Sequence, residues 1–180
     1  MTPLRWFWTA ALFSLIVDLA SKALIFRLLG VESPIEGVYG SPSGIWLLPG
    51  AFRLIHHYNT GGAFGWAAGN VPLFLAAAAL LIPILVLTAY HCLEPDSPLW
   101  SLGLIIGGAL GNLYDRLFHP GVRDFLEIVN PATGYSLWPV FNLADAAIVI
   151  GVVVYLIWSV INVPRRRRPP DRREKGEIHA

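Results

Sequence analysis

Hydrophobic residues form four long runs along the chain, and polar residues gather between the runs. A helix needs about 20 consecutive apolar residues to cross the hydrocarbon core of a bilayer. The pattern therefore predicts a membrane all-α fold with four transmembrane helices, which cover residues 6–29, 71–91, 99–118 and 141–162.

The segments between the runs predict little additional structure. Residues 31–70 combine many glycines and prolines with short apolar and aromatic stretches, so we expect a small β-containing platform on the membrane between helices 1 and 2. Residues 119–140 form a shorter outer loop, in which the pattern predicts one amphipathic turn or short helix over 124–129.

Composition supports the membrane assignment. Hydrophobic residues make up 55% of the 180 residues and charged residues only 14%, which excludes an ordinary soluble domain. The single cysteine, Cys92, excludes an internal disulfide and gives no cysteine metal cluster. We therefore expect the fold to depend on helix packing. Gly103, Gly107 and Gly111 recur every four residues, a spacing that allows another helix to approach closely.

Basic residues predict the orientation. Seven of them lie within residues 165–175, directly after the fourth run, which places the C-terminus in the cytoplasm. Four spans return the N-terminus to the same side. We predict one domain over residues 1–164 and a disordered basic tail over 165–180, which contacts anionic lipid and not nucleic acid.

Charged and amide side chains inside the spans are candidates for a site, because such groups are costly in lipid. Asp18 and Lys22 are four residues apart, share a helix face and are expected to neutralise each other as a supporting pair. Asn112 and Arg116 are harder to explain by packing alone, since a guanidinium suits a carbonyl or carboxylate. Asp115 is expected either to orient Arg116 or to cap another loop.

Two further acids are expected at one depth. Asp124 closely follows the third run and Asp145 opens the fourth, so both belong to the outer interface. Two acids in a poorly solvated cleft do not both ionise easily, so one keeps a proton while the other accepts one from water. Asn142 lies on the face of Asp145 and is placed to orient an acid. Glu127 is the alternative second acid, although we expect it on the exposed side of a turn.

The chain resembles the lipoprotein signal peptidase (signal peptidase II) family. The matching stretches, which follow the order of the family's motifs, are DLASK (18–22), NTGGAFG (59–65), GGALGNLYDR (107–116), GVRDF (121–125) and FNLADAAIVIG (141–151). The chain departs from the common pattern at Leu19, Gly62 and Gly65, which lie outside the acid pair.

The resemblance implies an intramembrane aspartyl endopeptidase that cleaves prolipoproteins before a diacylglyceryl-modified cysteine. We also expect a monomer in the bacterial inner membrane, in contact with membrane lipids, with its active site at the outer leaflet and with no metal or other cofactor. The residues to which the resemblance gives roles are the catalytic pair Asp124 and Asp145, the substrate-binding residues Asn59, Gly61, Asn112, Arg116 and Asn142, and the supporting residues Asp18 and Lys22. We expect Asp115 to be supporting as well, and Phe64, in the glycine-rich clamp, to cover the site.

Two other functions would also use these acids. An ion or proton carrier would distribute polar groups along a path across all spans. A lipid phosphotransferase would gather several acids around magnesium.

Overall fold

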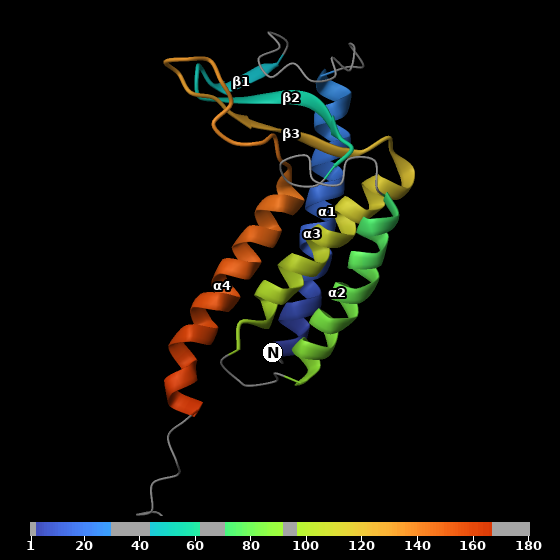
Figure 1. Ribbon diagram of the computed structural model, residues 1–180, viewed down its shortest axis with the longest axis vertical. Coiled ribbons are helices and arrows are strands. Elements are labelled where there is room, and N and C mark those ends of the chain that lie inside the picture. The colour runs from blue at the N-terminus through green and yellow to red at the C-terminus, as the bar shows by residue number, and fades with distance from the viewer. Residues whose placement is uncertain (1–2, 30–43, 62–70, 92–96, 167–180) are drawn as a thin grey trace, which may run out of the picture.

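Four helices and a small sheet make up the fold. The computed structural model describes residues 3–29, 44–61, 71–91 and 97–166. In chain order the elements are α1 (Pro3–Leu29), β1 (Ile45–Leu48), β2 (Phe52–Asn59), α2 (Val71–His91), α3 (Leu99–Phe118), β3 (Val122–Ile128) and α4 (Leu143–Arg166). The strands form a sheet across one end of the helices (Figure 1). Four helices with a small strand-containing unit agree with the predicted fold.

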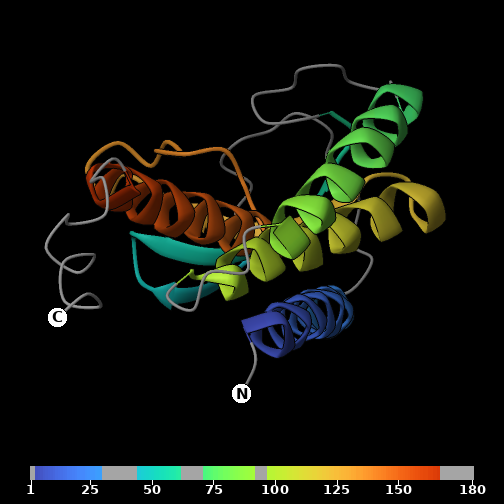
Figure 2. The ribbon, with the colours of Figure 1, turned by 90° about the horizontal axis from the view of Figure 1, so that it is seen from below.

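Helix α3 lies at the centre of the helical layer, in contact with α1, α2 and α4 (Figure 2). Its predicted small-residue ridge faces α1, because a Cβ atom added at Gly103 would overlap the carbonyl of Phe7 and one at Gly107 that of Ala11. Gly108 allows the same close approach to Ala144 of α4. The assignment of the glycine ridge to close packing is confirmed.

The described helices coincide with the four apolar runs, although they differ in apolar character. Within the described residues, α4 alone contains a stretch long and apolar enough to cross a membrane, Leu143–Asn162, with a mean hydropathy of 2.3. The part of α2 from Leu80 to His91 is a shorter apolar stretch. Helix α4 also continues to Arg166, beyond the predicted domain boundary, and the rest of the predicted basic tail lies outside the described residues.

The sheet is antiparallel with strand order β1-β2-β3. Its first two strands fall in the predicted platform. The third does not, and the turn or short helix predicted over 124–129 is wrong because Val122–Ile128 is a strand. This strand is buried at nearly every position, and its sequence therefore lacks the alternation that marks a half-exposed strand.

The predicted exposure of Glu127 is also wrong. Its side chain is only 1% exposed and its Oε2 atom accepts a hydrogen bond from Arg53 Nε at 2.5 Å. The pairing of β3 with β2 explains this burial, since Arg53 and Glu127 are cross-strand partners. The sheet thus provides a buried partner that the sequence pattern did not reveal.

Candidate active site

The two outer acids, Asp124 and Asp145, line one pocket of about 230 Å³ at the junction of the sheet and the helices. Asp124 comes from β3 and is 1% exposed, whereas Asp145 comes from the first turn of α4 and is half-buried. The pocket is lined by Asn59, Asn112, Arg116, Val122, Asp124, Trp138, Pro139, Val140, Phe141, Asp145, Ile148 and Val149. One group of lining residues is therefore polar and the other apolar.

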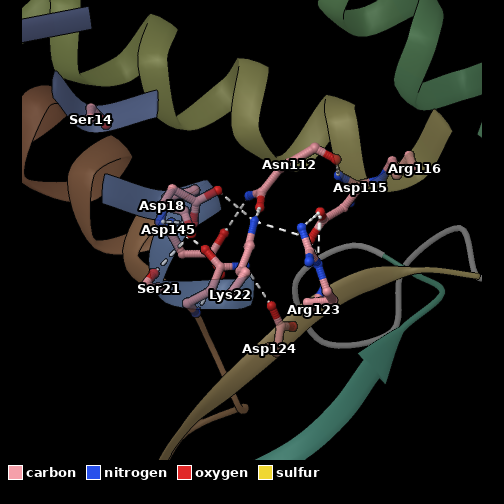
Figure 3. A network of polar contacts seen from close by, with 12 residues as sticks. Ser14, Asp18, Ser21, Lys22, Asn112, Asp115, Arg116, Arg123, Asp124 and Asp145 are labelled. Atoms are coloured by element: carbon pink, nitrogen blue, oxygen red, sulfur yellow. Dashed lines mark hydrogen bonds and ion pairs between the residues drawn. The ribbon is translucent and has the colours of Figure 1, made fainter. Parts of the chain in front are cut away.

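Asparagine amides connect the two carboxylates. Asn142 Nδ2 donates to Asp124 Oδ1 at 2.6 Å and to Asn112 Oδ1 at 3.1 Å. Asn112 Nδ2 in turn donates to Asp145 Oδ1 at 2.8 Å, as the close view shows (Figure 3). Asn59 Nδ2, which also lines the pocket, donates to Asp124 Oδ2 at 3.0 Å. These bonds fix both acids relative to each other.

The start of α4 explains why a carboxylate occupies position 145. Asn142 Oδ1 accepts the backbone N–H of Asp145 at 3.0 Å, and Asp145 Oδ2 accepts the backbone N–H of Asn142 at 3.2 Å. This reciprocal arrangement is a capping box, and the positive end of the helix dipole favours a carboxylate there. Asp18 Oδ1 accepts a third N–H of this helix end, from Ala144, at 3.0 Å.

Asp124 has an unusual protonation equilibrium. Burial, reinforced by the nearby Asp145 carboxylate, raises the pKa of Asp124 from 3.8 to about 7, although the amides of Asn59 and Asn142 oppose this rise. At neutral pH a large fraction of Asp124 therefore carries a proton. A buried acid that keeps its proton beside a second carboxylate is suited to general acid and base chemistry.

Lys22 connects the buried charge network to the pocket. Its Nζ atom lies 2.7 Å from Asp18 Oδ2, 3.2 Å from Asp115 Oδ2 and 2.9 Å from Asn112 Oδ1, and its side chain is fully buried. The expected Asp18–Lys22 pair is confirmed. The contact with Asn112 also fixes that amide, because its oxygen faces the ammonium and its nitrogen faces Asp145.

Arg123 completes the buried charge network, and the sequence pattern predicted no role for it. Its Nη2 and Nε atoms donate to Asp115 Oδ1 at 2.7 and 3.1 Å, and its backbone N–H donates to Asp115 Oδ2 at 2.9 Å. Asp115 thus holds the loop that leads into β3, one of the two roles expected for it. Successive side chains of a strand point to opposite faces, so Arg123 points away from its neighbour Asp124.

The predicted substrate-binding residues occupy different places. Asn59, Asn112 and Arg116 line the pocket, whereas Asn142 is fully buried among them. Arg116 donates to the Asn112 carbonyl at 3.1 Å and to the Gly61 carbonyl at 3.3 Å, so Gly61 contacts the site through its backbone. Phe64 and the rest of the predicted clamp from residue 62 to 65 lie outside the described residues.

Metal binding finds no support in the described part of the chain. There, no group of three or more His, Cys, Asp or Glu side chains could hold a metal ion. The basic partners of Asp18 and Asp115 already occupy those carboxylates. The acids that remain in the pocket are Asp124 and Asp145.

Helices beneath a small sheet, with paired acids in one pocket, are the arrangement expected of an aspartic membrane peptidase. A family model described as "Signal peptidase (SPase) II" matches residues 10–161. The lipoprotein signal peptidase of Syntrophomonas wolfei is 40% identical over 164 residues, which cover 90% of this chain and 97% of the relative. That of Rhodopseudomonas palustris strain TIE-1 is 37% identical over 174 residues, covering 94% and 100%.

The chain therefore belongs to the signal peptidase II family, and the enzyme class predicted from the sequence, an aspartic endopeptidase, is confirmed. A solved structure described as "Bacterial membrane enzyme structure by the in meso method at 2.3 A resolution" has a similar fold. It matches with a TM-score of 0.69 and 23% identity, and the match covers 90% of this chain and 92% of that structure.

Proposed function

We propose that this peptidase removes signal peptides from prolipoproteins, cleaving before the diacylglyceryl-modified cysteine, and that Asp124 and Asp145 activate the water. The observation that carries the proposal is the pocket shared by the two acids, which asparagine amides join to one another. The relatives that match nearly the whole chain are lipoprotein signal peptidases.

The proposed chemistry follows from the different surroundings of the acids. Asp145, half-buried at a helix N-terminus, accepts a proton from water while the water oxygen bonds to the scissile carbonyl carbon. Asp124 gives its proton to the carbonyl oxygen, which produces a gem-diol. Asp145 then protonates the amide nitrogen, the C–N bond breaks, and Asp124 recovers a proton from the diol. Protons balance over the two steps.

The walls of the pocket suit a lipidated peptide. Arg116, Asn112 and Asn59 offer donors and acceptors that we propose bind the extended peptide around the scissile bond. The apolar wall, which includes Trp138 and Ile148, faces the hydrophobic part of the substrate. We also propose that the enzyme acts as a monomer and that the two acids work without a metal or organic cofactor.

We also propose that all four helices span the bacterial inner membrane, with the sheet at its outer face. The start of α1 and the end of α4 both lie at the end opposite the sheet (Figure 1). The basic cluster after α4 favours placing that end in the cytoplasm. Large apolar side chains exposed on α1, α2 and α4, such as Phe13, Leu80 and Val160, then face lipid.

The polar groups favour the peptidase over the two alternatives. A carrier requires a polar path from one face of the membrane to the other. In the described residues the charge network instead lies beside the sheet, where Asp18 and Lys22 meet Asp115, Arg123 and the start of α4. A magnesium-dependent phosphotransferase requires clustered acids, and the described residues contain no such cluster.

One assay tests the proposed function. The purified protein in detergent micelles receives a diacylglyceryl-modified prolipoprotein, or the same chain with its cysteine replaced by serine, each with and without a chelator. We expect mass spectrometry to show a single product that begins at the lipidated cysteine, formed equally with the chelator. Equal turnover of the serine substrate would contradict the assigned specificity, and loss of turnover with the chelator would contradict the metal-free mechanism.

The proposed proton on Asp124 predicts the alkaline limb of the pH profile. Because its pKa is about 7 in the free protein, kcat/KM should fall above that pH, approaching about tenfold for each further pH unit. Initial rates from pH 5 to 9 would measure the fall, and circular dichroism over the same range would exclude unfolding as its cause. A kcat/KM that stays constant to pH 9 would show that a protonated Asp124 is not required.

A further inference from the structure

Glu127 is a buried acid that the proposed chemistry does not use. Both of its oxygens are occupied, since Oε2 accepts from Arg53 Nε at 2.5 Å and Oε1 accepts from the hydroxyl of Ser136. Arg53 is itself 5% exposed and lies under the ring of Trp46, 5.2 Å from its centroid. We call Arg53, Glu127 and Ser136 the Glu127 cluster.

The cluster holds the loop that joins the two proposed catalytic elements. Residues 129–142 connect β3, which carries Asp124, to α4, which carries Asp145. Ser136 is half-buried, whereas Tyr135 and Leu137 on either side are 73% and 60% exposed. Its side chain therefore points back toward the sheet, where the Leu137 N–H also donates to the Ile128 carbonyl at 2.8 Å.

The chain reaches the pocket immediately after this attachment. Trp138, Pro139 and Val140 follow Ser136 by two to four residues, and all three line the pocket on its apolar side. The loop is attached at Ser136 on one side of these three residues and at the bridge between Phe141 and Leu126 on the other. The hydrogen bond from Ser136 to Glu127 is thus one of the attachments that hold Trp138, Pro139 and Val140, the loop part of the apolar wall.

We infer that the Glu127 cluster is a positioning device for substrate affinity, with Ser136 as the residue that fixes the apolar wall. This inference rests on the proposed function of the pocket. A separate set of amides, from Asn59, Asn112 and Asn142, holds the two acids. The cluster therefore acts on binding and leaves the bond-breaking steps intact.

This separation has a kinetic signature. Contacts between the wall and the substrate are present before and during the reaction, so their loss raises KM while kcat is preserved. A general weakening of the fold would instead lower the amount of active enzyme and leave KM unchanged.

Ser136→Ala tests the inference, with Tyr135→Phe as the matched control because it removes an exposed hydroxyl from the adjacent residue. Substrate is the diacylglyceryl-modified prolipoprotein, with its concentration expressed as mole fraction in the micelles. We expect KM to rise about three- to tenfold in Ser136→Ala, which corresponds to the loss of one typical hydrogen bond, with kcat within about twofold. Ser136→Thr should restore KM, and Tyr135→Phe should match the wild type.

Hydrogen–deuterium exchange gives a second readout that needs no substrate. Peptides covering 130–140 should exchange faster in Ser136→Ala than in the wild type or Tyr135→Phe, because the wall is less firmly held. Unchanged exchange, unchanged KM, or a lower kcat at constant KM would each overturn the inference. A wild type that cleaves no prolipoprotein would instead refute the proposed function, and exchange would still test the cluster.

Discussion

Asp124→Asn and Asp145→Asn are each expected to lower kcat by about 10³-fold or more while the protein remains folded. Asparagine preserves the shape of the side chain but neither carries nor accepts the proton that the proposed steps require. The expected loss is large because each acid acts in both steps. Single-turnover cleavage of the diacylglyceryl-modified prolipoprotein measures it, and retention of a tenth of the wild-type rate in either variant would exclude that acid from the chemistry.

The unfolding temperature of Asp124→Asn provides the control, because the pKa of Asp124 predicts whether the variant is more or less stable than the wild type. The folded-state pKa of Asp124, about 7, lies above its ordinary value of 3.8, so the folded state binds the proton more tightly. The resulting stabilisation is fully present below pH 3.8 and is lost as the pH rises through about 7. Asparagine has no such dependence. Above pH 7 the variant should therefore unfold at a temperature equal to or higher than that of the wild type, and a markedly lower temperature would point to misfolding as the cause of inactivity.

The two acids could be located from the sequence because the prediction required only their depth in the membrane. Counting residues along apolar runs places Asp124 after one helix and Asp145 at the start of another, and the structure places both on one pocket. The glycine ridge was predictable for a similar reason, since its spacing is local to one helix. Features that depend on the spacing of residues along the chain can thus be predicted from the sequence.

The amide network and the third strand could not be derived in this way. Asn112 and Asn142 are thirty residues apart, and nothing in either segment indicates that their side chains bond to each other. Strand β3 is covered on both faces, so its sequence has no alternation to distinguish it from a short helix. Because a turn or short helix was predicted in place of the strand, Glu127 was wrongly predicted to be exposed.

The second large expected effect is a loss of folding stability when the balance of buried charges is disturbed. Lys22 and Arg123 offset Asp18 and Asp115 in a network in which all four side chains are buried. Arg123 pairs with Asp115, so Lys22→Met removes the basic partner of Asp18 and also removes the donor that fixes the Asn112 oxygen. Removing one partner from a buried ion pair costs about 3–5 kcal/mol, so the free energy of unfolding should fall by about that amount, with most of the activity lost as well.

Arg27→Met is the matched control, because it makes the same kind of change at an exposed position on the same helix, and it should alter stability by less than about 0.5 kcal/mol. Chemical denaturation in mixed micelles measures both variants. Adding Asp18→Asn to Lys22→Met should recover part of the loss, since one uncompensated carboxylate is then neutral, and the double-mutant cycle gives their coupling. If Lys22→Met is no more destabilising than Arg27→Met, the buried network does not support the fold, and Lys22 does not orient the amide that binds Asp145.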